Sequence, residues 1–254
     1  PTTLYGRQRY DAFGRQVQTF GLDGTVTLQT RYHALSTDAW DAADLGPGPH
    51  QGTHASAVKD GHGRSIDTIE RIHAGQAIEE RHILTSYFPS GEVAKITRHR
   101  GPLSQATPSQ DVVRWMRYDS LGRMVLNVEP NTTVGFSPDL STPAESMKAW
   151  RYAYDDAGDL VGTSDARGCG ANYHYDAAGR LVAEDYSPCL PHHAPYSAPN
   201  LATGENTEVF TKYDSYDSAD QADVAAVAGE HPDFDGSPAF LLGRVASVSD
   251  RGAR

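Results

Sequence analysis

Aromatic and apolar residues alternate with polar ones in short runs along this chain, and most runs end at an aspartate or a glycine. The alternation is clearest in residues 152–161 and 173–182, where tyrosines occupy two alternate positions before the break. A period of two places both rings on one face of a β-strand. The aspartate that follows can bond to the backbone two residues on, and the glycine three residues later tolerates the positive φ that closes a β-turn. Each stretch therefore predicts a β-hairpin.

The same offsets recur along the chain as a unit of tyrosine, aspartate, two variable residues, glycine and arginine. Its members are Tyr10, Asp11, Gly14 and Arg15; Asp60, Gly63 and Arg64; Tyr87 and Gly91; Tyr118, Asp119, Gly122 and Arg123; Tyr154, Asp155 and Gly158; and Tyr175, Asp176, Gly179 and Arg180. A further copy is interrupted, since it begins at Tyr213-Asp214 and its exit matches Gly243-Arg244. The arginine at the mouth of the turn can reach back to the aspartate and the tyrosine face. Several copies in one register predict tandem hairpins.

This unit resembles the YD repeat of the Rhs family, which includes the B and C components of bacterial insecticidal toxin complexes, polymorphic Rhs toxins and the animal teneurins. The resemblance covers residues 8 to about 250. It implies an all-β fold in which tandem antiparallel hairpins form an open curved or spiralling sheet, a segment of a hollow shell. In the bacterial toxins the shell encloses a cytotoxic polypeptide. The implied partners are neighbouring YD repeats of the same longer chain and an enclosed toxin polypeptide, and the implied location is secreted or cell-surface associated.

Composition agrees with a repeat strip more than with a compact enzyme. The 254 residues include 24 glycines and 15 prolines and are 38% hydrophobic, which suits a thin, turn-rich sheet; we expect one segment, 1–254. The net charge of −11 argues against a nucleic-acid partner, because binding phosphates requires a basic face. No apolar run reaches the ~20 residues of a membrane helix. The chain begins Pro1-Thr-Thr, without an initiator methionine or a signal peptide, so we expect a piece of something longer.

Strands are expected on both sides of each turn. The predicted ranges are 2–9, 16–20, 25–32, 65–72, 78–87, 92–100, 112–118 and 124–128, in addition to those of the two central hairpins. Two of them, 65–72 and 78–87, form an unusually long hairpin around Ala74-Gly75.

Four segments interrupt the strand pattern. Residues 36–54 predict an excursion with one helical turn over 37–45, capped by Ser36 or Thr37. Residues 142–147 predict a second helical turn, and 187–204 an irregular loop. Residues 218–229 give the best helix signal, with a serine cap, an acidic first turn, alanines and a terminal glycine, and we expect a helical insertion there.

The sequence offers few candidates for a metal or cofactor site. The spacing of His50 and His54 suits a metal, but the glycine and proline around them disfavour a helix, and His192-His193 has no further partner nearby in sequence. The Asp233-Phe-Asp235-Gly236 segment lacks the third acidic residue and the distal glutamate of a calcium loop. We therefore expect loop histidines and a solvated turn, with no metal and no cofactor.

Nucleophilic catalysis also lacks a motif. No GxSxG elbow is present, and neither cysteine has a histidine beside it. The Rhs shells that cleave themselves share an aspartate-proline-glycine core, which this chain lacks, so no catalytic residue is carried over. The chain is expected not to be an enzyme.

Cys169 and Cys189 flank the second central hairpin and are expected to be free thiols. A disulfide is the alternative, and it would need a small offset or a bulge to bring the two residues together across the strands.

The repeated aromatic residues leave two functions open. The rings can pack on one another as a ladder inside a shell wall, or they can face outward and bind carbohydrate or protein in a surface adhesion module. The exposure of Tyr10, Tyr118, Tyr154 and Tyr175 distinguishes the two. We favour the shell wall.

Overall fold

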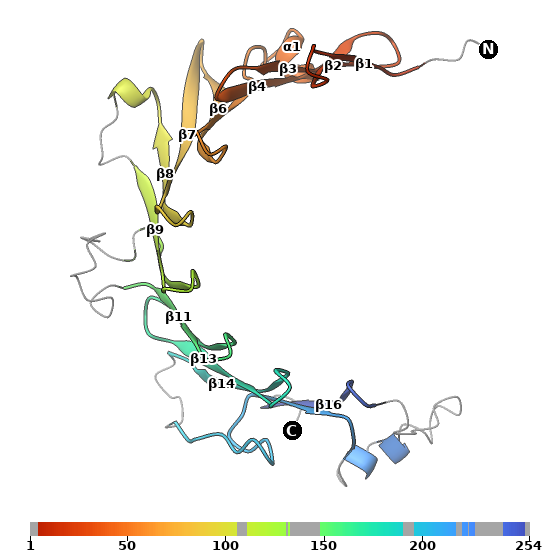
Figure 1. Cartoon of the computed structure of the whole chain (residues 1–254), viewed down its shortest axis with the longest axis vertical. Coiled ribbons are helices and arrows are strands. Elements are labelled where there is room, and N and C mark those ends of the chain that lie inside the picture. Colours follow the sequence, from red (N-terminus) through yellow and green to blue (C-terminus); the bar gives the residue numbers. More distant parts are fainter. Residues whose placement is uncertain are drawn as a thin grey trace. The chain divides into compact units, whose positions relative to one another are not determined.

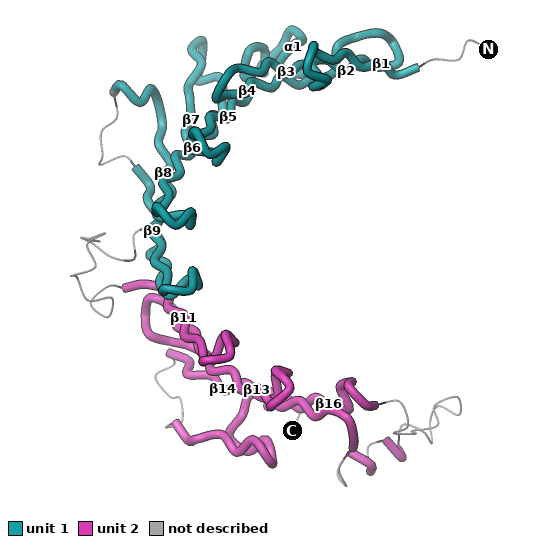
Figure 2. The backbone as a smooth tube through the Cα atoms, in the orientation of Figure 1, with its two compact units in different colours: residues 1–131 teal, residues 132–254 magenta. Residues whose placement is uncertain are grey.

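The computed structural model of the chain describes residues 5–105, 111–130, 132, 148–189, 196–216, 220–222, 224–226 and 241–251. Within them the fold is all-β and the strands are antiparallel, as predicted. The chain divides into two compact units, residues 1–131 and 132–254 (Figure 2). The expectation of one segment spanning 1–254 stays a prediction.

The first unit is an open sheet in which each strand pairs with the next along the chain (Figure 1). Its strands are β1 (Arg7–Tyr10), β2 (Gln16–Phe20), β3 (Val26–Tyr32), β4 (Ser36–Asp41), β5 (Ala55–Lys59), β6 (Ser65–Ala74), β7 (Ala77–Tyr87), β8 (Val93–Arg100), β9 (Val112–Tyr118) and β10 (Met124–Val128). The predicted long hairpin is β6–β7, and it turns at Gly75 with φ +68°. A short 3-10 helix, η1 (Leu103–Gln105), follows β8.

The second unit repeats this arrangement with fewer strands. These are β11 (Trp150–Tyr154), β12 (Leu160–Ser164), β13 (Gly170–Tyr175), β14 (Leu181–Ser187), β15 (Val209–Tyr213) and β16 (Val245–Asp250). β11 to β16 pair in sequence order. The interrupted repeat closes as predicted, because Tyr213 pairs with Val245 and the N–H of Asp214 donates to the carbonyl of Arg244 at 3.1 Å.

Glycine sets the geometry of the repeated turn. The four full copies have positive φ at Gly14 (+76°), Gly122 (+76°), Gly158 (+98°) and Gly179 (+74°). The pairing register shifts by one residue directly before each of these turns, at Tyr10, Tyr118, Tyr154 and Tyr175. A three-residue hairpin loop that ends in a left-handed glycine produces this bulge. The four full copies therefore share a positive-φ glycine and a one-residue bulge.

One predicted excursion is partly a strand. Residues 36–41 form β4, which pairs with both β3 and β5, so the predicted loss of strand pattern at Ser36 is wrong. The helical turn is α1 (Ala42–Leu45), and its cap is Asp41 rather than Ser36 or Thr37. Asp41 Oδ1 accepts from the N–H groups of Ala43 and Asp44 at 2.8 and 2.9 Å. Pairing on both sides outweighs the weak apolar pattern of this segment.

Of the predicted helical insertion at 218–229, residues 220–222 and 224–226 are helical. The predictions for residues 142–147, His192-His193 and Asp233 to Gly236 lie outside the described residues. No helix among the described residues has the length and apolar character needed to cross a membrane.

The interior is small and mixed. Among the described residues, the buried apolar side chains are Phe20, Met116, Leu126, Val128, Ala149, Ala183 and Phe210, and the buried polar ones are Ser56, Asp67, His82, Thr97, His99, Arg117, Asp185 and Thr207. Polar groups are thus as frequent as apolar ones, so hydrogen bonds and ion pairs must hold much of each sheet.

Candidate functional site: the repeated tyrosine, aspartate and arginine turn

The aspartate of the repeat organises its turn. In the copies at Asp11, Asp60, Asp119 and Asp176, one carboxylate oxygen accepts from the backbone N–H groups two and four residues later, at 2.8 to 3.0 Å. The other oxygen accepts from Nε of the arginine at 2.7 or 2.8 Å. The carboxylate therefore fixes the backbone and the arginine together.

These bonds act on the charged form of the carboxylate. The backbone N–H of Arg180 and then its guanidinium lower the pKa of Asp176, against a smaller opposing effect of burial. At Asp119, the backbone N–H of Arg123 is the largest cause of a lowered pKa. The turns are therefore built to work with ionised aspartates.

Three of the arginines that are held in this way cover the tyrosine of the following hairpin. The guanidinium carbon lies 4.4 Å from the ring centre for Arg15 on Tyr32, 4.5 Å for Arg64 on Tyr87 and 4.4 Å for Arg180 on Tyr213. The sequence predicted that the arginine would reach back to the aspartate and the tyrosine face of its own turn. It reaches that aspartate, but the ring it covers belongs to the next hairpin, so the contact joins successive hairpins.

The tyrosine hydroxyl adds a second link in the same direction. It donates to the backbone carbonyl of the residue that follows the arginine position, from Tyr32 to Gln16 (3.2 Å), Tyr87 to Ser65 (2.7 Å), Tyr175 to Leu160 (3.0 Å) and Tyr213 to Leu181 (3.0 Å). We call one such connection between neighbouring hairpins a step. At three steps the ring is covered by a guanidinium, whereas the ladder model predicted coverage by another tyrosine.

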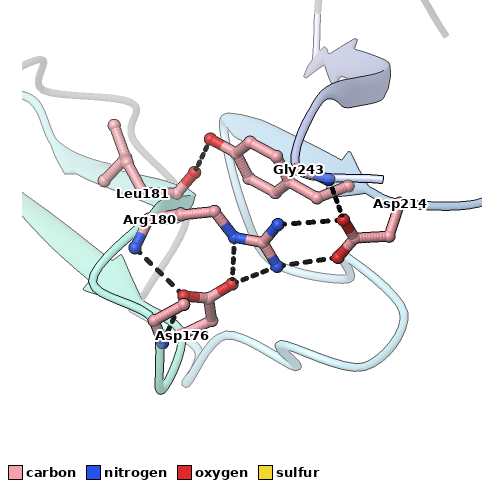
Figure 3. Close-up of polar contacts among 7 residues, drawn as sticks. Asp176, Arg180, Leu181, Asp214 and Gly243 are labelled. Atoms are coloured by element: carbon pink, nitrogen blue, oxygen red, sulfur yellow. Dashed lines mark hydrogen bonds and ion pairs between the residues drawn. The ribbon is translucent and has the colours of Figure 1, made fainter. Parts of the chain in front are cut away.

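The step at Arg180 includes one more ion pair (Figure 3). Arg180 donates to both oxygens of Asp214, at 3.2 and 2.9 Å, while its Nε bonds to Asp176. Asp214 also accepts from the N–H of Gly243 at 2.6 Å. The carboxylates of Asp214 and then Asp176 raise the pKa of Arg180. One guanidinium thus joins the turns of two successive repeats.

At two positions of the repeat the arginine is replaced by an acidic residue. Glu92 stands there before Tyr118, whose ring meets that of Phe88 edge to face with the centroids 6.1 Å apart. Asp159 stands there before Tyr175. Among the described residues, no cation or aromatic ring covers Tyr175, and the carboxylate of Asp159 has no hydrogen-bond or ion-pair partner. Burial and then the charge of Asp159 raise the pKa of Tyr175.

Tyr175 and Asp159 line an open groove of about 610 Å³ in the second unit. Asp155, Asp176, Tyr173 and Tyr196 also line it. A neighbouring groove of about 480 Å³ contains Arg180 and Tyr213, where the arginine already covers the ring.

Several histidines in the described part of the chain have structural partners. The ring of His54 stacks on Trp40 at 4.4 Å. Two buried histidines on strands were not singled out in the sequence. His82 bonds to Asp67 at 2.8 Å and His99 bonds to Asp111 at 2.7 Å. Nothing in the local pattern identifies these pairs, because the partners come from different strands or loops.

The prediction of two free thiols is wrong, since Cys169 and Cys189 form a disulfide with Cα atoms 5.2 Å apart. The pairing register explains why they meet. Tyr175 pairs with Leu181 beside the turn, but after the bulge Gly170 pairs with Ser187, which brings Cys189 close to Cys169. Within the described part of the chain, one group of three side chains could contact a single metal ion; it is Asp165 with these two cysteines, whose sulfurs are bonded to each other.

Two members of the pattern were missed in the sequence. Tyr32 makes both contacts of the step although no aspartate or glycine turn follows it. Asp165 organises a turn of the same kind between β12 and β13, where its N–H donates to the carbonyl of Cys169 at 2.7 Å and Gly168 has φ +92°. An aspartate three residues before a glycine was the available signal.

Comparison with known proteins agrees with this geometry. No family model matches the chain. Over 177 residues it is 28% identical to double-stranded DNA deaminase toxin A of Burkholderia cenocepacia (strain H111), a match that covers 68% of this chain and 10% of that protein. The crystal structure of TcdB2–TccC3 without its hypervariable C-terminal region superposes with a TM-score of 0.63, at 15% identity, over 96% of this chain and 10% of that chain.

The chain thus spans about a tenth of the length of both proteins. At 15% identity the structural likeness concerns the fold, and it covers nearly the whole chain. The resemblance to the Rhs/YD-repeat family is therefore confirmed at the level of fold, since this chain shares its all-β repeat architecture with part of the TcdB2–TccC3 toxin complex.

Proposed function

We propose that the chain is a non-enzymatic wall segment of an Rhs/YD-repeat shell that encloses a toxin polypeptide for secretion or delivery. The observation that carries this proposal is the step, in which one turn binds the next through an arginine and a tyrosine hydroxyl. Such links join neighbours in series, so an array can lengthen without needing a single large core. The shared fold with TcdB2–TccC3 supports the same role.

The disulfide is also consistent with this role. Disulfides form and persist mainly in oxidising compartments, as expected for a protein that is secreted or displayed at the cell surface. The negative net charge of −11 keeps the strip soluble and gives it no general affinity for nucleic acid.

The alternative, an adhesion module that binds carbohydrate through its tyrosines, has less support. A sugar ring would need an open aromatic face, and guanidinium groups cover Tyr32, Tyr87 and Tyr213. Tyr10 is 57% exposed, but it stands on β1, the first described strand of its unit, which has no described hairpin before it.

The experiment is protease protection in the complete protein that contains this segment and the polypeptide that it encloses. We expect the enclosed polypeptide to remain uncut until the turns are opened by Gly158→Val combined with Gly179→Val. The matched control is Ala157→Val with Ala178→Val, at exposed positions next to those glycines, which should leave the protection intact. If protease cleaves the enclosed polypeptide as fast in the unsubstituted protein as in the double glycine variant, the proposal is contradicted.

A second measurement addresses the isolated chain. Among the described strands, β1 and β16 each pair on one side only and so offer unpaired backbone groups, and the chain should associate as its concentration rises. Sedimentation velocity with a circular-dichroism check of strand content tests this. A monomer at all concentrations would contradict an open wall segment.

A further inference from the structure

The step at Asp159 differs from three others in one respect. At Arg15, Arg64 and Arg180 a guanidinium from the turn lies against the next tyrosine at 4.4 to 4.5 Å. Tyr175 has the same backbone anchor, since its hydroxyl bonds to the carbonyl of Leu160, which follows the arginine position. Its ring is therefore placed as in the other steps, but the chain supplies a carboxylate where the others supply a cation.

The chain thus shows which ligand such a site accepts. In the step of Figure 3, the guanidinium lies over the tyrosine ring of the next repeat and bonds to the turn aspartate and to Asp214. At Tyr175, a comparable set of groups lines an open groove of about 610 Å³: the ring, the turn aspartate Asp155, and the carboxylates of Asp159 and Asp176. A planar cation can stack on the ring and bond to a carboxylate at the same time.

We infer that this groove binds an arginine side chain of another polypeptide, which takes the place that an arginine of the chain occupies at the other steps. The guanidinium lies on Tyr175 and pairs with the carboxylate of Asp159, which has no partner of its own among the described residues. The site belongs to this chain alone and does not depend on the proposed wall function. Only the identification of the bound polypeptide with the enclosed toxin rests on that function.

Glu92 provides an internal control. It is also an acidic residue in place of the arginine, but the ring that follows it, Tyr118, already meets Phe88 edge to face. Removing one negative charge at Glu92 changes the net charge as much as removing one at Asp159, and it leaves the groove untouched. A difference between the two variants therefore reports on the site and not on the charge of the whole chain.

The test is NMR titration of the 254-residue chain, labelled in its tyrosine rings, with N-acetyl-arginine amide. The uncharged isostere N-acetyl-citrulline amide is the control ligand. We expect saturable shifts of the Tyr175 signals with the arginine probe and none with citrulline. Asp159→Asn should weaken binding about fivefold, and Glu92→Gln should leave it unchanged. Asp159→Arg should abolish binding, because an arginine at that position would occupy the ring from within the chain.

Three outcomes would overturn the inference. The first is equal shifts with citrulline or with a neutral sugar, which would favour a hydrogen-bonding or carbohydrate site. The second is equal weakening of arginine binding by Asp159→Asn and Glu92→Gln, which would mean that the net charge of the chain, and not the site, attracts the probe. The third is full binding by a folded Asp159→Arg variant. If circular dichroism shows that Asp159→Arg does not fold, the inference is tested by comparing the binding of the arginine probe to Asp159→Asn and to Glu92→Gln.

Discussion

Two consecutive steps of the second unit use the same backbone anchor and opposite charges. At both steps the tyrosine hydroxyl lies 3.0 Å from the carbonyl it bonds to, Tyr175 to Leu160 and Tyr213 to Leu181. Arg180 covers Tyr213 and pairs with two aspartates, whereas Asp159 leaves Tyr175 open to a groove. The tyrosine hydroxyl and the turn are therefore common to both steps, while the arginine adds a link that only one of them has.

The largest expected effect comes from opening the disulfide of the hairpin that both steps share. Tyr175 ends β13 and Arg180 precedes β14, so this one hairpin carries a part of each step, and the disulfide closes its far end. Reduction should lower the free energy of unfolding by about 3 kcal/mol, since the cross-link closes a loop of 20 residues. Urea unfolding with and without reductant measures it. The double variant Cys169→Ser with Cys189→Ser should be insensitive to reductant, and an unchanged midpoint in the parent chain would contradict the prediction.

The next effect concerns the turn that carries Arg180. Gly179 has φ +74°, where a β-branched side chain is strained, so Gly179→Val should cost more than about 1 kcal/mol of unfolding free energy. Ala178→Val places the same side chain at the adjacent exposed position and should change stability by less than about 0.5 kcal/mol. Thermal unfolding of both variants gives the comparison. Equal losses of unfolding free energy in the two variants would mean that the size of the valine side chain, and not the positive φ of Gly179, causes the destabilisation.

These turns were the most predictable part of the molecule. An aspartate and a glycine at fixed spacing determine a local structure, and strand bounds such as Gln16–Phe20 and Met124–Val128 followed from where the turns lie. The strand Ser36–Asp41 was missed because its pairing with both neighbours, rather than its own alternation, holds it in the sheet. The disulfide was missed because a one-residue bulge decides which residues face each other.

The steps could be predicted only in part. The sequence indicates that an arginine and a tyrosine recur, but each tyrosine hydroxyl bonds to a carbonyl 15 to 32 residues earlier in the chain. That separation varies with the insertions between turns, so spacing alone does not identify the partner. The open site at Tyr175 becomes visible only when Asp159 is compared with the arginines that occupy the equivalent place.

A smaller effect sharpens the comparison of the two rings. Tyr175→Leu and Tyr213→Leu each remove one hydroxyl bond, which contributes about 1 kcal/mol. Only Tyr213→Leu also removes the contact with Arg180, so it should destabilise the chain more. A double-mutant cycle with Arg180→Met should show coupling to Tyr213, and a cycle with Asp159→Met should show none to Tyr175. Equal coupling energies for Arg180 with Tyr213 and for Asp159 with Tyr175 would contradict the view that only the first ring is held by its neighbour.

The smallest effect is expected from acid, and its sign follows from the pKa values. Arg180 is the main cause that lowers the pKa of both Asp176 and Asp214 from the ordinary 3.8. Carboxylates with a lowered pKa in the folded state contribute stability that is present above 3.8 and is lost as the pH falls through their folded values. The link at Arg180 should therefore persist at neutral pH and disappear below about pH 3.8.

The measurement is the stability of the parent chain and of Asp176→Asn by urea unfolding from pH 7 to pH 3. The parent should be more stable at pH 7, and the difference should shrink as the parent's own carboxylates become protonated. Asp156→Asn, at an exposed turn position with no ion pair among the described residues, is the matched control and should show no such convergence. A difference between the parent and Asp176→Asn that stays constant to pH 3 would mean that the turn depends on the shape of the residue at position 176 and not on its charge.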